Sequence, residues 1–128
     1  MSGELTVLAL YGLLIIITIF IETGLSIQQM GDAWMRSPRD DGRRKEGTSG
    51  RAERAVLNCS IAMALFAPAI LLLAIQDAFT GLTLAAAWTF LIARVIYVAT
   101  YIMGIPTVRT LAFVTGILAT MLLYILAL

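Results

Sequence analysis

The residues best suited to chemistry in this sequence are one arginine and two tyrosines inside an otherwise apolar stretch. Arg94 lies well within Gly81–Met103, and Tyr97 and Tyr101 follow it at i+3 and i+7. In a helix, this spacing places the three side chains on one face, as a strip of one guanidinium and two phenols. Such a strip is rich in hydrogen-bond donors and is suited to binding an anion. The alternative is an arginine that extends to the cytoplasmic headgroups beside a belt of interfacial tyrosines.

Two further polar groups stand at the ends of other apolar stretches. Arg54 and Asn58 are spaced i, i+4, and Arg109 and Thr110 begin the last apolar stretch. Asn58 lies a full turn into its stretch, where an amide without hydrogen bonds is costly. We therefore expect Asn58 to bond either a neighbouring helix or a ligand.

If these stretches are packed helices, three arginines meet at one membrane level. Arg54, Arg94 and Arg109 then outline an anion site, because guanidinium groups bind carboxylates and phosphates through paired hydrogen bonds. Glu22, in the first apolar stretch, either pairs with one of these arginines or extends to the interface.

Other kinds of site are excluded by composition. The 128 residues contain no His and one Cys, Cys59, so imidazole chemistry is excluded and an intrachain disulfide cannot form. No metal site is expected. The formal net charge of +1 gives no indication of nucleic-acid binding.

The elements that position these residues are predicted to be membrane-spanning helices. The chain is 60% hydrophobic and 13% charged, which is far more apolar than a soluble domain. Since a span needs roughly 20 apolar residues, we predict spans at about 5–29, 53–75, 79–103 and 107–128 in a single domain, 1–128. The short later connections predict an all-α membrane protein, a four-transmembrane-helix antiparallel bundle. Pro68 predicts a kink in the second span.

One polar loop, at about residues 30–52, separates the first two spans. It contains turn signals such as Ser37-Pro38 and Asp41-Gly42. The basic residues outside the spans lie in or beside this loop and the short connection near Gly104. Both connections lie on one side of a four-span protein, so the positive-inside rule makes that side cytoplasmic and both termini non-cytoplasmic. We expect these residues to set topology and attract anionic lipids rather than bind a specific partner.

Five segments of the sequence resemble the MAPEG family, the membrane-associated proteins in eicosanoid and glutathione metabolism. They are Arg51-Ala-Glu-Arg-Ala-Val-Leu-Asn58, Leu65-Phe-Ala-Pro-Ala-Ile-Leu71, Ala93-Arg-Val-Ile-Tyr97, Tyr101-Ile-Met-Gly-Ile-Pro106 and Arg109-Thr110. The resemblance runs from about Ser37 to the C-terminus, and the bacterial members are the most similar. It implies a homotrimer of four-helix bundles in the bacterial inner membrane, with glutathione in a cytoplasm-facing cleft between neighbouring subunits.

The resemblance also implies roles for individual residues. Arg109 and Thr110 would lie near the thiol as catalytic groups. The residues that would bind glutathione are Arg54, Asn58, Arg94, Tyr97 and Tyr101. The implied activities are glutathione transfer to lipophilic electrophiles, peroxide reduction and isomerisation of lipid peroxides.

The sequence departs from the family pattern at the second span. The family motif continues from Asn58 to a glutamate that helps hold glutathione, and here that position is Ile61. Val56 stands where the family often has His, and Ser26-Ile-Gln-Gln29 stands where the family has basic residues. The first functional hypothesis is therefore a glutathione-dependent transferase or peroxidase. The alternative is a non-catalytic structural or accessory subunit that has lost glutathione and partners other membrane proteins.

A third hypothesis, from a different class, is a small multidrug transporter with Glu22 as its proton site. The long polar loop and the intramembrane Arg94 argue against it.

Overall fold

The computed structural model describes all 128 residues and contains five helices and no strand. The helices are α1 (Gly3–Met30), α2 (Asp32–Arg36), α3 (Gly47–Ile75), α4 (Gly81–Met103) and α5 (Pro106–Ala127). All except α2 are long and apolar enough to cross a membrane. The predicted all-α, four-span architecture is confirmed.

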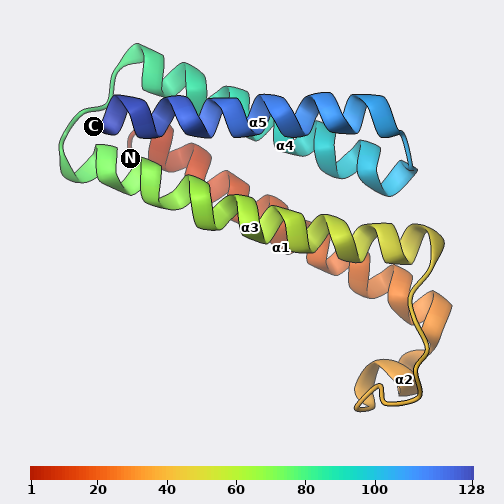
Figure 1. Ribbon diagram of the computed structural model, residues 1–128. Helices are drawn as coiled ribbons and strands as arrows, with labels where there is room; N and C mark the ends of the chain where they lie inside the picture. Colours follow the sequence, from red (N-terminus) through yellow and green to blue (C-terminus); the bar gives the residue numbers. More distant parts are fainter.

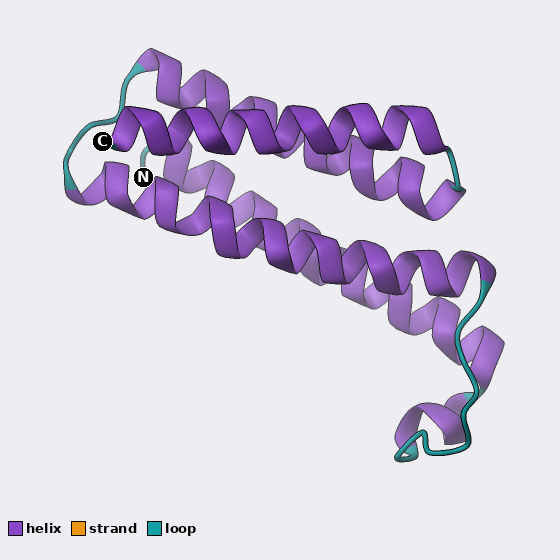
Figure 2. Cartoon of the chain, in the orientation of Figure 1, coloured by secondary structure: helices purple, strands orange, loops and turns teal.

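The helices run antiparallel in two pairs, α1 with α3 and α4 with α5 (Figure 1). Both chain termini and the α3–α4 connection lie at one end of the bundle. The α4–α5 connection and the α2 loop lie at the other end, where the two pairs diverge. The helices are straight or gently curved (Figure 2). Short loops connect α3 to α4 and α4 to α5, whereas α2 and a longer loop connect α1 to α3. Both termini therefore lie on the same side of the membrane.

Local sequence explains where most helices begin and end. The Ser2 hydroxyl accepts a hydrogen bond from the Leu5 backbone N–H and caps α1. Thr80 caps α4 in the same way. Gly104 ends α4 in the left-handed conformation, with φ 78°, and Pro106 occupies the first turn of α5. The helix α3 continues through Pro68, so the predicted kink does not interrupt it.

The helix α3 begins at Gly47, several residues before the predicted start at 53. Contacts with α1 fix this extra turn and a half. The Gln29 side chain donates to the Glu46 carbonyl at 2.7 Å and accepts from the Glu46 N–H at 2.8 Å. A Cβ at Gly50 would lie 2.9 Å from the Lys45 carbonyl oxygen, so only glycine permits this close approach.

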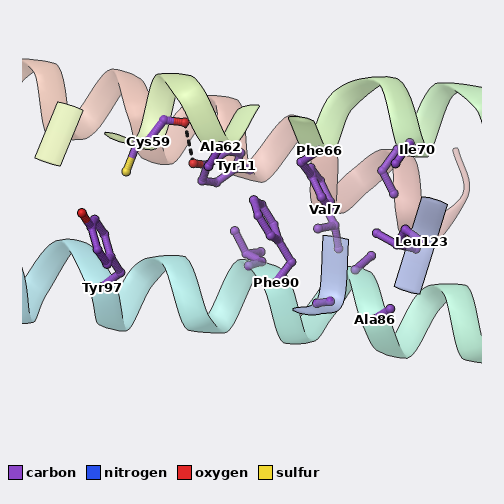
Figure 3. Packing of buried hydrophobic residues seen from close by; sticks show 14 of the residues in the cluster. Val7, Tyr11, Cys59, Ala62, Phe66, Ile70, Ala86, Phe90, Tyr97 and Leu123 are labelled. Carbon is purple, nitrogen blue, oxygen red and sulfur yellow. Dashed lines mark hydrogen bonds between the residues drawn. The ribbon is translucent and has the colours of Figure 1, made fainter. Parts of the chain in front are cut away.

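An aromatic cluster forms the centre of the bundle (Figure 3). The rings of Phe66 and Phe90 stack with centroids 3.8 Å apart, and Tyr11 packs edge-on against both. The Tyr11 hydroxyl donates to the Cys59 carbonyl at 2.7 Å, which satisfies the one polar atom that the ring brings into this core. Large apolar side chains such as Phe20, 73% exposed, cover the outside and face lipid.

The polar loop is attached to the bundle by Lys45, the only lysine of the chain. Its side chain is 6% exposed, and its ammonium bonds the carboxylates of Glu22 on α1 and Glu53 on α3. Burial lowers the pKa of Lys45, but the hydrogen bonds to these carboxylates outweigh it and raise the pKa above its usual value. Glu22 thus pairs with Lys45 of the loop and not with one of the three arginines.

The outer part of the loop folds around Trp34. The guanidinium carbons of Arg39 and Arg43 lie 5.1 and 5.9 Å from the centroid of its ring. The indole N–H donates to Asp41, and this bond together with the Arg43 backbone N–H lowers the pKa of Asp41. Two of the loop arginines therefore pack against a tryptophan.

Candidate functional site

Arg94 is buried at the centre of the site, with only 1% of its surface exposed. One of its nitrogens, Nη2, donates to Asn58 Oδ1 at 2.9 Å and approaches Cys59 Sγ at 3.1 Å. Its guanidinium carbon lies 4.1 Å from the centroid of the Tyr97 ring. Arg94 does not extend to an interface, and Asn58 is bonded to a neighbouring helix through it.

The stem of Arg94 packs between neighbouring helices. Gly116 of α5 faces Arg94, and a Cβ added there would lie 3.5 Å from Arg94 Cδ. The aliphatic stem of the arginine therefore packs directly against α5 at Gly116, where an alanine methyl would also fit in ordinary contact. Figure 3 shows Tyr97 projecting from α4 toward Cys59 on α3, so the guanidinium lies between these two helices.

The other two arginines surround Tyr101, one turn beyond Tyr97 on α4. Arg54 Nε donates to the Tyr101 hydroxyl at 3.1 Å. The guanidinium carbons of Arg54 and Arg109 lie 6.0 and 4.8 Å from the centroid of the Tyr101 ring. The two tyrosine rings are 5.4 Å apart. Three helices thus contribute one arginine each to a single pair of tyrosines.

A hollow of about 260 Å³ opens beside these side chains. Its lining comes from α3, α4 and α5 and consists of Asn58, Tyr97, Tyr101, Arg109, Thr110 and Phe113. Thr110 lines the hollow, although its hydroxyl bonds the Pro106 carbonyl of its own helix. All seven residues predicted for the site therefore lie in or around one region of the bundle.

The site carries uncompensated positive charge. The three salt bridges of the chain use Arg36 and Lys45 as cations, and none involves Arg54, Arg94 or Arg109. The Nε of Arg94 is buried and has no protein acceptor. Buried charge without a partner is costly in a membrane protein, so this arrangement favours an anionic ligand.

Sequence reasoning did not assign three residues around the site. Cys59 contacts Arg94, and Phe113 lines the hollow. Arg51 donates to the Ile102 carbonyl at 3.0 Å and so joins the start of α3 to the end of α4. Arg51 shortly precedes the assigned Arg54, and Cys59 directly follows the assigned Asn58. This proximity in the sequence was the only signal that could have assigned them. For Phe113 the sequence contains none.

Ile61 lies on the outward side of α3, one turn beyond Asn58. It is 56% exposed, and Leu57 and Leu65 on either side are 63% and 45% exposed. The position that holds a glutamate in the family pattern is thus part of a continuous apolar stripe.

The model of one protein family matches residues 7–128, nearly the entire chain, and its description is the MAPEG family. The chain belongs to the MAPEG family. The match spans α3, α4 and α5 completely, and so it includes every residue of the candidate site. No protein of curated function matches the sequence. This MAPEG protein is therefore an integral membrane protein of a family named for glutathione and eicosanoid metabolism, as the resemblance predicted.

Proposed function

We propose that this MAPEG protein is a glutathione-dependent transferase or peroxidase that acts on lipophilic substrates. The observation that carries the proposal is the cluster of Arg54, Arg94 and Arg109 around two tyrosines, with no carboxylate bonded to any of them. Glutathione has two carboxylates that guanidinium groups can bind. A cationic neighbour also favours the thiolate, which is the nucleophile.

In the transferase reaction the chain's own residues bind and orient the thiol. Arg94 and Arg54 hold carboxylates, while Arg109 and Thr110, at the rim of the hollow, stabilise the thiolate. The sulfur forms a bond to an electrophilic carbon, and the leaving group departs with its electron pair. The exposed apolar surfaces of α4 and α5 give a lipophilic substrate access from the bilayer.

The family resemblance supports a homotrimer, in which a neighbouring copy completes the site. Ligand sites for small molecules usually enclose 300–1,000 Å³, and the hollow of one chain is about 260 Å³. Native mass spectrometry in mild detergent should give three times the 13.9 kDa mass of the chain. A monomer would leave the hollow open on one side and remove the intersubunit site.

The proposed location is the bacterial inner membrane, with both termini non-cytoplasmic. The site and the arginine-rich loop lie at the end opposite the termini (Figure 1), so this orientation places the site next to cytoplasmic glutathione. A reporter fused after Leu128 should be active only when exported. A reporter that is active in the cytoplasm would show the opposite orientation, with the site on the non-cytoplasmic side.

Replacing Arg109 tests the proposed activity directly. Arg109→Ala should abolish most conjugation of glutathione to a lipophilic electrophile, because it removes a charge-assisted contact worth about 2–5 kcal/mol. The measurement is initial rate at millimolar glutathione in detergent. Arg44→Ala is the matched control, since Arg44 is exposed and forms no hydrogen bond or salt bridge.

A non-catalytic accessory subunit is the second candidate function. The apolar stripe of Leu57, Ile61 and Leu65 favours it, because the position that holds a glutamate in the family pattern contains no polar group for a ligand here. If native protein and Arg109→Ala show the same background rate at every glutathione concentration, this function replaces the first.

A further inference from the structure

Arg51 forms the outermost contact between α3 and α4, at the end of the bundle where the two helix pairs diverge (Figure 1). It is spaced i, i+3 and i+7 with Arg54 and Asn58, so the three side chains share the face of α3 that meets α4. Asn58 and Arg54 bond side chains of α4, whereas Arg51 bonds its backbone. Arg51 does not line the hollow.

The acceptor of this bond is a carbonyl that its own helix leaves without a partner. Ile102 lies in the last turn of α4, and the residue four positions later, which would donate in a continuing helix, is Pro106. The Nε of Arg51 donates to the Ile102 carbonyl at 3.0 Å instead. The last turn of α4 contains no basic residue, so a cation from α3 complements the negative end of its dipole.

The guanidinium of Arg51 also packs against the turn between α4 and α5. A Cβ added at Gly104 would lie 3.5 Å from Arg51 Cζ, so the guanidinium lies directly against the backbone of this turn. The Nη2 of Arg51 donates to the Thr48 hydroxyl at 3.2 Å, which orients the guanidinium from its own helix. Arg51 therefore ties the start of α3 to the turn that begins α5.

Residues of the proposed site lie on both sides of this turn. Tyr101 directly precedes Ile102, and Arg109 lies in the first turn of α5. The bond from Arg54 to the Tyr101 hydroxyl, at 3.1 Å, is the next contact inward from Arg51. A change at the turn therefore moves Tyr101 and Arg109 relative to Arg54.

From these contacts we infer that Arg51 is a positioning residue for the proposed glutathione site. It holds Tyr101 and Arg109 at the spacing from Arg54 that the ligand requires, and it does so through the Ile102 carbonyl without touching the ligand. The inference rests on the proposed function and adds a residue that sets the affinity for glutathione.

The test uses Arg51→Met and Arg51→Lys as a matched pair. Both side chains are long and unbranched, but only lysine retains a donor for the Ile102 carbonyl. Calorimetric titration in detergent should show that Arg51→Met binds glutathione about tenfold more weakly than native protein, because small displacements of positioned groups are costly. Arg51→Lys should recover most of this affinity. Thr48→Val, which removes only the Nη2 contact, should bind as native protein does.

Hydrogen–deuterium exchange in the absence of ligand gives the second measurement. The amides of Gly104 and Ile105 bond carbonyls in the last turn of α4. They should exchange faster in Arg51→Met and at nearly the native rate in Arg51→Lys. Since Arg51 is half-buried at the start of α3 and lies outside the hydrophobic core, all of these variants are expected to fold.

The results separate this inference from the proposed function. Native affinity in Arg51→Met would overturn the positioning role and leave the transferase proposal standing. Weaker affinity with native exchange at the turn would make Arg51 a ligand contact, and equal losses in Arg51→Met and Arg51→Lys would show that the donor to Ile102 is not the cause; either result would overturn the inference. Absence of glutathione binding by native protein would overturn the proposed function and, with it, this role.

Discussion

Replacing Lys45 by methionine is expected to lower the stability of the protein by about 3–5 kcal/mol, the usual cost of breaking a buried ion pair from one side. The substitution leaves Glu22, whose side chain is 13% exposed, with the Ser26 hydroxyl as its remaining partner. It also loosens the segment before α3, which is then held to α1 by the two Gln29–Glu46 hydrogen bonds. Thermal unfolding in detergent measures the first effect, and the rate of tryptic cleavage after Arg43 and Arg44 measures the second.

Two variants and a pH series control this prediction. Arg44→Met, which removes an exposed cation and its own cleavage site from the same loop, should change neither the thermal unfolding nor the rate of cleavage after Arg43. Adding Glu22→Gln to Lys45→Met should recover much of the loss, because it removes the unpaired buried charge. Since the folded state raises the pKa of Lys45, its contribution is fully present at neutral pH and is lost as pH rises above about 10.4. Unchanged cleavage in Lys45→Met would show that the loop is held by Gln29 alone.

The spans could be predicted because their signal lies in composition and length. A run of apolar residues long enough to cross a bilayer has few alternatives to a helix. The convergence of the arginines was predictable for a related reason. A charge such as Arg94 inside a span must face the bundle, and the other polar helix ends at the same level are the only neighbours available to it.

The loop could not be predicted in the same way. Gly47-Thr-Ser-Gly50 has the composition of a turn, and tertiary contacts from Gln29 and Lys45 make it helical. The partner of Glu22 was missed because Lys45 lies 23 positions away in a segment without periodicity. Contacts between a loop and a helix leave no regular pattern in the sequence, whereas contacts between helices do.

Replacing Arg94 and Asn58 together separates binding from folding. The free energy of unfolding of the double variant Arg94→Met, Asn58→Leu should lie within about 1 kcal/mol of the native value, because apolar replacement of both buried partners is nearly neutral or stabilising. Its affinity for glutathione should nevertheless fall by roughly thirtyfold to several thousandfold, which corresponds to 2–5 kcal/mol. Thermal unfolding with and without glutathione measures both quantities: the native protein gains stability with ligand and the double variant does not.

The single substitutions give the physical reason for this outcome. Arg94→Met alone strands the Asn58 carbonyl and should cost about 1–3 kcal/mol of stability. Asn58→Leu alone removes the one strong acceptor of a guanidinium that already has an unbonded Nε, so it should destabilise the protein more than the double change does. If the double variant unfolds at a far lower temperature than either single variant, Arg94 is required for packing against Tyr97 and Gly116. If the double variant folds as expected, the fold does not need Arg94, and the proposed anionic ligand accounts for a buried arginine that no carboxylate neutralises.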